Sequence, residues 1–239
     1  MLQFTLLQAR DAEDLARDEE HAAFAARLSV DPGQIHCVDL LKTVLTPGIL
    51  EGRDALLVGG SGDYSVLDPH PSIQRFVDFL GEVCALGFPT FASCFGFQAL
   101  ALALGGVVVS DPDRAEVGSY TLHLTDAGQQ DPLFQTLPSR FLAQLGHKDH
   151  VTSLPSGVLH LAGSALSPYQ ALRVAGKPIY ATQFHPELTW QDNRQRYLRY
   201  MSTYGALFGE AEAQERLESH VPGPEANTLL ATFARTVLS

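Results

Sequence analysis

Short apolar runs alternate with helical patterns along the first half of the chain. Runs typical of buried strands occur at residues 2–8, 35–40, 55–58 and 89–93. Apolar residues recur at helical spacing between them, at residues 12–28, 73–86 and 95–104. This alternation predicts strand–helix units, and therefore a mostly parallel central sheet with helices packed on its faces.

The second half of the chain has more strands and fewer helices. Strand-like runs occur at residues 107–109, 120–124, 141–145, 159–162, 171–174 and 179–184. One helical pattern follows at residues 191–204. Because consecutive strands without intervening helices pair as hairpins, we expect antiparallel strands to extend the parallel sheet here.

The last stretch differs from the rest. A charged helical pattern at residues 209–219 is followed by the break Val221-Pro222-Gly223-Pro224, and a final helix carries an apolar stripe of Leu229, Leu230, Phe233 and Val237. The stripe either packs on the domain or docks a partner, and we favour packing because most such stripes face a core. We therefore expect one domain over residues 1–205 and a helical extension over residues 206–239.

Composition narrows the class of protein. With 45% hydrophobic and 18% charged residues, the 239-residue chain is typical of a globular protein with a sizeable core. Its formal net charge of -11 argues against nucleic acid and anionic membrane surfaces as partners, because phosphate binding needs clustered Lys and Arg.

The cysteines and the N-terminus indicate the compartment. Cys37, Cys84 and Cys94 are an odd, sparse set without CxxC spacing, which argues against a disulfide framework and a cysteine zinc site. The first residues lack the basic and apolar regions of a signal peptide, and no run is long enough to span a bilayer. We expect a cytoplasmic protein with no metal site and no cofactor.

Cys94 stands out because of its position. The predicted strand at residues 89–93 runs directly into Cys94, and a helix begins at Phe95 with Gly96 next. This order resembles a nucleophile elbow, in which a sharp turn presents the side chain at the carboxyl edge of the sheet. Unpaired N–H groups at the helix start favour a thiolate there. We interpret Cys37 and Cys84 as inert buried thiols, and Cys94 as a nucleophile.

A candidate base follows another strand. His185 comes after the run at residues 179–184, Pro186 restricts the turn, and Glu187 lies two residues further on. A carboxylate in this position can accept the imidazole N–H and fix its tautomer. Cys94, His185 and Glu187 therefore provide the nucleophile, base and orienter that acyl transfer through a thioester requires.

Four stretches together resemble the class I (triad-type) glutamine amidotransferases, and within that family the GMP synthase branch. In chain order they are Val58-Gly59-Gly60-Ser61-Gly62, Cys94-Phe95-Gly96-Phe97-Gln98, the segment from Gly146-His147-Lys148-Asp149 to Leu154-Pro155-Ser156-Gly157, and Gln183-Phe184-His185-Pro186-Glu187. The resemblance covers residues 2–204 in order.

The resemblance implies a fold and roles for more residues. It implies a flavodoxin-like three-layer α/β/α sandwich with a mostly parallel central sheet. It also implies an oxyanion hole formed by the backbone N–H groups of Gly60 and Phe95. By the same similarity, the residues that contact the substrate are Gly59, Gln98, His147 and Asp149.

The chain also departs from the family pattern. Ala92 and Ser93 stand where the family usually has Gly and an apolar residue before the nucleophile, and Ser61 replaces a common Pro. The stretch after Tyr204 is too short for the ATP-pyrophosphatase domain of GMP synthase, and no GxxxxGK[ST] phosphate loop occurs.

Three functions remain open from the sequence. The first is hydrolysis of glutamine with delivery of ammonia to a separate synthetase partner. The second is a free-standing γ-glutamyl peptidase or hydrolase, since the same triad serves both and only the leaving amine differs. The third, a non-catalytic binding subunit, is the least favoured because Cys94, His185 and Glu187 are all present.

Overall fold

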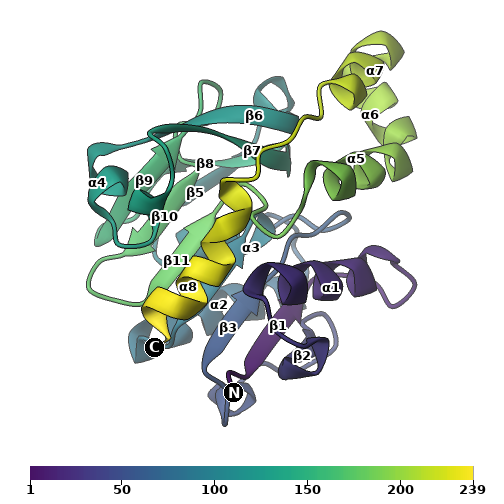
Figure 1. The fold of residues 1–239 in the computed structure, drawn as a ribbon. Helices are drawn as coiled ribbons and strands as arrows, with labels where there is room; N and C mark the ends of the chain where they lie inside the picture. The colour runs from purple at the N-terminus through teal and green to yellow at the C-terminus, as the bar shows by residue number, and fades with distance from the viewer. Residues whose placement is uncertain (239) are drawn as a thin grey trace.

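One mixed sheet runs through the middle of the molecule (Figure 1). The computed structural model describes residues 1–238, and nine strands of this part form the sheet. In spatial order they are β2 (Ile35–Asp39), β1 (Phe4–Gln8), β3 (Ala55–Val58), β4 (Thr90–Ser93), β11 (Ile179–Thr182), β10 (Ala171–Val174), β9 (Val158–Gly163), β6 (Glu116–Leu124) and β7 (Arg140–His147). The strands from β2 to β11 pair in parallel, and those from β11 to β7 pair in antiparallel fashion.

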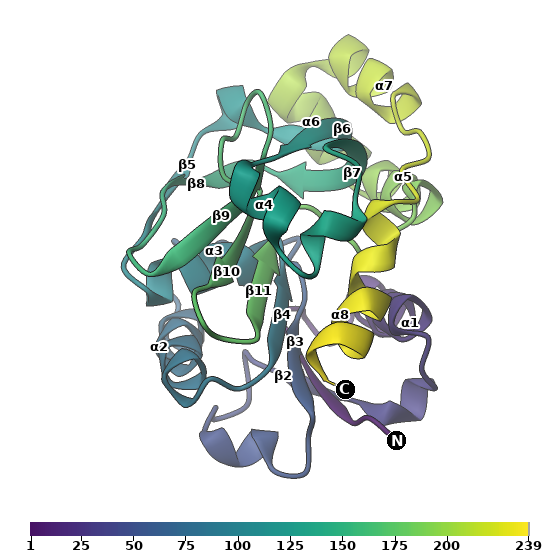
Figure 2. The same cartoon turned by 60° about the vertical axis from the view of Figure 1, so that its left-hand side comes forward.

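Helices cover both faces of the sheet, and Figure 2 shows α2 on one side with α1 and α8 on the other. One apolar layer holds α2 (Pro71–Leu86), α3 (Phe95–Ala103) and a small antiparallel sheet of β5 (Val107–Ser110) and β8 (Asp149–Ser153). The opposite layer holds α1 (Ala16–Leu28), α8 (Leu229–Val237) and the segment after α4 (Asp126–Gln130). Short 3-10 helices lie at Pro32–Gln34, Pro47–Leu50, Pro112–Arg114, Phe134–Thr136 and Ala226–Thr228. The predicted three-layer α/β/α sandwich is confirmed.

Three further helices form a separate group beside the sheet. They are α5 (Trp190–Arg199), α6 (Met201–Phe208) and α7 (Glu210–Glu218). The prediction of one helix over residues 191–204 is wrong, because α5 ends at Arg199 and Tyr200 leaves helical geometry with φ −98° and ψ 16° before α6 begins. Tyr197 and Tyr204 stack across this junction with ring centroids 4.3 Å apart, so aromatic packing holds the two helices at their angle.

The end of the described chain belongs to the core. Leu229, Leu230 and Phe233 of α8 are fully buried. The Phe233 ring lies edge-on to Phe91 of β4 at 5.5 Å and to Tyr180 of β11 at 6.2 Å. The apolar stripe of the final helix therefore packs against the two central strands. The boundary between residues 205 and 206 stays a prediction.

The parallel half of the sheet aligns three strand ends. Val58 of β3 pairs with Ala92 of β4, and Ser93 of β4 pairs with Thr182 of β11. Because parallel neighbours in register end at the same edge, the segments that follow these strands leave the sheet side by side. Those segments contain the glycine-rich turn, Cys94 and His185.

Candidate active site

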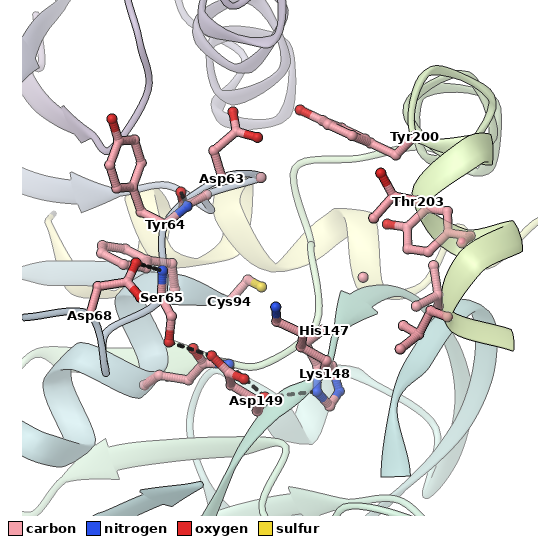
Figure 3. Close-up of a pocket in the computed structure, with 18 of the residues that line it drawn as sticks. Asp63, Tyr64, Ser65, Asp68, Cys94, His147, Lys148, Asp149, Tyr200 and Thr203 are labelled. Carbon is pink, nitrogen blue, oxygen red and sulfur yellow. Dashed lines mark hydrogen bonds between the residues drawn. The ribbon is translucent and has the colours of Figure 1, made fainter. Parts of the chain in front are cut away.

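Cys94 occupies a strained turn between β4 and α3. Its φ is 51° and its ψ is −102°, a positive-φ conformation that side chains other than glycine rarely adopt. Two backbone hydrogen bonds fix it: the Cys94 N–H donates to the Thr182 carbonyl at 2.7 Å, and the Cys94 carbonyl accepts from the Gln98 N–H at 3.1 Å. The sulfur lies at a cavity (Figure 3).

The tight turn depends on the glycine two residues later. A Cβ atom at Gly96 would lie 2.7 Å from Cγ1 of Val58 and 3.0 Å from Cβ of Ala92. Such distances are far inside van der Waals contact, so α3 can approach the sheet only with glycine at this position. The same measurement shows how Ala92 is accommodated where the family usually has glycine: Gly96 leaves room for its methyl group.

His185 and Glu187 form a buried, short hydrogen bond. His185 Nδ1 lies 2.6 Å from Glu187 Oε1, and Glu187 is fully buried. Burial lowers the pKa of His185, but the charges of Glu187 and Cys94 and hydrogen bonds to both outweigh it and raise the pKa to about 10. Burial raises the pKa of Glu187, and the paired His185 lowers it below its ordinary value by a larger amount. At neutral pH the imidazole is therefore protonated beside the sulfur.

Two buried side chains support this pair, and the sequence pattern assigned neither of them a role. Ser93 Oγ lies 3.3 Å from Oε1 of Glu187, to which it donates, with the Val58 carbonyl as an alternative acceptor at 3.5 Å. Gln183 Nε2 donates to the Cys94 sulfur at 3.6 Å. The signal for Ser93 was present in the sequence as a polar residue at a position that is usually apolar.

The glycine-rich turn lies against both reacting side chains. A Cβ at Gly60 would lie 2.9 Å from Cε1 of His185 and 3.7 Å from Cβ of Cys94, so the backbone passes at close range. The Gly60 N–H donates to Oε1 of the buried Glu20 at 3.1 Å. A side chain at Gly59 would collide with the same carboxylate, so Gly59 lies against Glu20.

Glu20 is another residue that the sequence did not reveal. It is fully buried and accepts hydrogen bonds from Arg10 Nη2 and Gln8 Nε2, both at 3.0 Å. Because an isolated buried charge is costly, the Arg10 partner is needed to hold this carboxylate beneath the turn. The Gly60 N–H, an expected oxyanion donor, is thus bound to a carboxylate in this structure.

The cavity at Cys94 has a volume of about 450 Å³. Gln98, His147 and Asp149 line it, and their contact with a substrate stays a prediction. Gln98 Nε2 donates to the Asp149 carbonyl at 2.7 Å and to Gln183 Oε1 at 3.1 Å, which fixes the amide. Oδ1 of Asp149 is buried and has no hydrogen-bond partner among the described residues, while its Oδ2 accepts from Ser65 Oγ at 2.5 Å.

His147 is held beneath the cavity by its own network. Its Nε2 lies 3.2 Å from Oε2 of Glu116, and its Nδ1 lies 3.0 Å from the Asp149 carbonyl oxygen. Gln170 donates to the same Glu116 oxygen at 2.6 Å. These buried contacts hold β6 and the β7–β8 connection in place behind the cavity.

A different element forms the opposite wall. Tyr200, at the junction before α6, and several α6 side chains line the cavity: Thr203, Tyr204, Ala206 and Leu207. Figure 3 shows Tyr200 and Thr203 on the far side of Cys94 from Tyr64 and Ser65. Burial and the neighbouring Tyr197 and Tyr200 raise the pKa of Tyr204, and the charge of Cys94 adds to the rise.

The other two cysteines differ from Cys94 in their surroundings. Burial raises the pKa of the Cys37 and Cys84 thiols to about 11, which makes both poor nucleophiles. Groups of three or more His, Cys, Asp or Glu side chains placed to hold a metal ion are absent from residues 1–238. None of the helices in this range is both long and apolar enough to cross a bilayer.

Comparison with known proteins gives related sequences and folds. A GMP synthase [glutamine-hydrolyzing] from Thermosipho africanus is 40% identical over 107 residues, which cover 45% of this chain and 20% of that protein. One subunit of the GMP synthase [glutamine-hydrolyzing] of Methanocaldococcus jannaschii is 34% identical over 123 residues, 52% of this chain and 63% of that protein. The chain thus matches a fifth of one relative and under two thirds of the other.

Solved structures agree on the fold. A glutamine amidotransferase from Thermotoga maritima superposes with a TM-score of 0.71 and 18% identity, covering 100% of this chain and 99% of that one. A glutamine amidotransferase from Methylobacillus flagellatus gives a TM-score of 0.70 at 18% identity, with 98% and 94% covered. The family model described as glutamine amidotransferase class-I matches residues 38–202, a segment that contains Cys94, His185 and Glu187. The chain belongs to the class-I glutamine amidotransferase family.

Proposed function

We propose that the protein hydrolyses the side-chain amide of glutamine through a thioester on Cys94. One observation carries the proposal: His185, held at 2.6 Å by Glu187, is protonated beside a sulfur that sits on a strained turn at a cavity. An imidazolium next to a cysteine favours the thiolate, which is the nucleophilic form.

The reaction runs in two steps that balance without a cofactor. The Cys94 sulfur attacks the γ-carbonyl carbon, the C–N bond breaks, and ammonia leaves with the proton that His185 donates. His185 then takes a proton from water, and the resulting hydroxide releases glutamate from the thioester. Glu187 keeps the imidazole in one orientation and stabilises its charge in both steps.

Backbone N–H groups hold the oxyanion in this mechanism. Phe95 is the first residue of α3, where an N–H has no partner within the helix and the helix dipole is positive. Gly60 is the second donor, and it has to leave Glu20 to serve. One such donor contributes about 3 kcal/mol to transition-state stabilisation.

The amino-acid end of glutamine binds beside Gln98, His147 and Asp149. The unpartnered buried Oδ1 of Asp149 suits the α-ammonium group, because such an oxygen otherwise costs free energy. Lys148 also lines the cavity and suits the α-carboxylate. Gly59 shapes the turn over Glu20, and its contact with the substrate stays a prediction.

Ammonia delivery to a partner synthetase is part of the proposal. It is supported by the similarity to a protein that is one subunit of a glutamine-hydrolysing GMP synthase. Glutamate release should then rise when the synthetase partner is added, whereas a self-sufficient hydrolase would not respond.

Glutamate release from glutamine tests the chemistry. The wild-type protein should form glutamate, and Cys94→Ala should form none, with Cys37→Ala as a control thiol that lies away from the cavity. Iodoacetamide labelling should map to Cys94. Undiminished glutamate release by the Cys94→Ala protein would refute the mechanism, and labelling without any hydrolysis would favour a non-catalytic binding role.

A second candidate function is hydrolysis of a γ-glutamyl conjugate. The observation in its favour is the cavity of about 450 Å³, which exceeds what one amino acid needs and falls in the range of sites for drug-sized ligands. Higher activity on γ-glutamyl amides than on glutamine, with no response to a partner, would support this candidate.

A further inference from the structure

We propose that the α6 wall of the cavity is a binding subsite for the amine half of a γ-glutamyl amide, and that it selects amines with an aromatic or branched aliphatic substituent. The inference rests on the proposed thioester chemistry at Cys94 and names the substrate class for it. The wall comprises Tyr200, Thr203, Tyr204, Ala206 and Leu207, called the α6 wall below.

The two sides of the cavity differ in chemistry. One part of the lining is Gln98, Lys148 and Asp149, which offer charge and hydrogen bonds to the amino-acid head of a glutamyl group. The α6 wall offers two tyrosine rings and aliphatic carbon. Since the amide carbon must sit at the sulfur, an acyl half bound on the polar side directs the amine half toward the α6 wall.

Tyr204 anchors the wall near the reacting atoms. Its ring stacks on Tyr197 at 4.3 Å and on Phe208 at 6.1 Å, so it is held rigidly by packing. Tyr204 and Cys94 line the same cavity. A rigid aromatic face at that place is suited to contact the first atoms of the leaving amine.

Leu207 and Thr203 form the outer part. Leu207 is 38% exposed although it is a large apolar residue, and it lines the cavity. An exposed leucine on the rim of a hollow gains stability when an apolar ligand group covers it. Tyr200 closes the far end: a Cβ at Gly62 would lie 2.5 Å from its hydroxyl, so glycine there lets the turn after β3 meet this junction.

Most of the α6 wall follows the segment that the family model matches. The family model ends at residue 202, so Thr203, Tyr204, Ala206 and Leu207 follow it in the chain. Cys94, His185 and Glu187 lie within it. Reactivity and choice of amine are thus carried by different segments.

The chemistry adds no new reactant. The C–N bond to the substituted amine breaks as Cys94 forms the thioester, and the amine leaves with the His185 proton. Water then restores the thiol and releases glutamate. Only the identity of the amine differs from the glutamine reaction.

Two alkyl amides of matched intrinsic reactivity test the subsite. Glutamate release is measured from γ-glutamyl-phenethylamide and γ-glutamyl-methylamide, with glutamine alongside. We expect kcat/KM for the phenethylamide to exceed that for the methylamide by about 10-fold, the effect of burying part of an aromatic group. Leu207→Ser should reduce this ratio by several fold, and Thr203→Trp, which fills the cavity, should reverse it.

Leu198→Ser is the matched control, because Leu198 is an exposed leucine on α5 that does not line the cavity. It should keep the wild-type ratio. Binding of both amides to Cys94→Ala protein, measured by calorimetry, gives the same preference without turnover. A kcat/KM ratio near one in the wild type overturns the subsite, and so does a ratio that neither Leu207→Ser nor Thr203→Trp changes. If glutamine is hydrolysed in the same assay, the proposed function stays intact. Absence of all hydrolysis with a preserved binding preference overturns the proposed function instead.

Discussion

The two walls of the cavity at Cys94 are built in different ways. On the sheet side, strand ends in register bring together a strained cysteine, a buried His–Glu pair and a glycine turn, and a Cβ at Gly60 or Gly96 would come within 2.9 Å of its neighbours. On the helix side, Thr203, Ala206 and Leu207 are exposed side chains of a short helix. The sheet side therefore leaves almost no room for larger side chains, whereas the exposed positions on the helix side can be substituted more freely.

This difference assigns separate tasks to the two walls. A thioester mechanism needs fixed distances between sulfur, imidazole and carboxylate, and misplacement by about 1 Å can cost 100-fold in rate. A subsite for a leaving amine needs only shape and apolar surface. The rigid wall lies within the segment matched by the family model, and most of the α6 wall follows it. The proposed thioester chemistry thus lies within the matched segment, whereas most of the proposed amine subsite follows it.

Replacing the nucleophile gives the largest expected effect. The Cys94→Ala protein should lose at least about 10⁴-fold in the rate of glutamate release, because the other groups of a triad contribute little once the nucleophile is gone. Coupled glutamate dehydrogenase assays on purified protein measure it. If Leu207→Ser or Thr203→Trp lowered the rate of glutamine hydrolysis as strongly as Cys94→Ala does, the two walls would not have separate tasks.

Replacing the orienter gives the next largest effect. Glu187→Gln keeps the size of the side chain but removes the charge that holds His185 protonated. We expect kcat to fall by about 10³- to 10⁴-fold, as for other triads that lose the correct tautomer. KM should change little, because Glu187 does not line the cavity. Steady-state kinetics on glutamine measures both.

The same variant has a pH signature in stability. The folded-state pKa of His185 is raised to about 10 from 6.5, so its contribution is complete below pH 6.5 and is lost as pH rises toward 10. The pKa of Glu187 is lowered from 4.5, so its contribution is present above pH 4.5 and is lost in acid. Between these limits Glu187→Gln should lower the free energy of unfolding by about 3 to 5 kcal/mol. The loss should become smaller at lower and at higher pH. A loss independent of pH in urea unfolding would contradict the ion pair.

Much of the rigid wall was predictable from sequence, and little of the helical wall was. Strand ends in a parallel sheet meet at one edge whatever covers them, so Cys94 and His185 could be brought together from their positions after apolar runs. The α5–α6 break at Tyr200 was missed because the apolar spacing continues through it. The rings of Tyr197 and Tyr204 stack across this break, a contact that the spacing of apolar residues does not predict.

Buried polar residues explain the other omissions. Glu20 lies in a helix whose charged residues indicate solvent, and only its pairing with Arg10 allows it to be buried beneath Gly60. β8 was not predicted as a strand because its first residues, Asp149 and His150, are polar. Their burial depends on partners such as Ser65 that lie far away in the sequence. Local patterns do not encode such long-range pairs.

A variant at Phe233 separates α8 from α6, since both helices extend beyond the family segment. Phe233→Ala should lower the free energy of unfolding by about 3 to 5 kcal/mol, because the ring is fully buried against Phe91 and Tyr180. Urea denaturation measures it, with the exposed Thr236→Ala as control. The ratio of activities on the two γ-glutamyl amides should stay as in the wild type. A changed ratio would mean that α8 also shapes the cavity.

The smallest effect is expected at Ser93, within the rigid wall. Its hydroxyl is a buried donor to the Glu187 carboxylate at 3.3 Å, and hydrogen bonds to charged groups contribute about 1.5 to 3 kcal/mol. Ser93→Ala should therefore lower kcat by about 10-fold with KM unchanged. Removing a donor that favours the charged form should also raise the pKa of Glu187. The acid limb of the pH–rate profile should therefore shift to higher pH. Ser93→Thr, which keeps the hydroxyl, should restore the limb. A lower rate with an unmoved limb would mean that Ser93 serves packing alone, and that the support of the triad ends at Glu187.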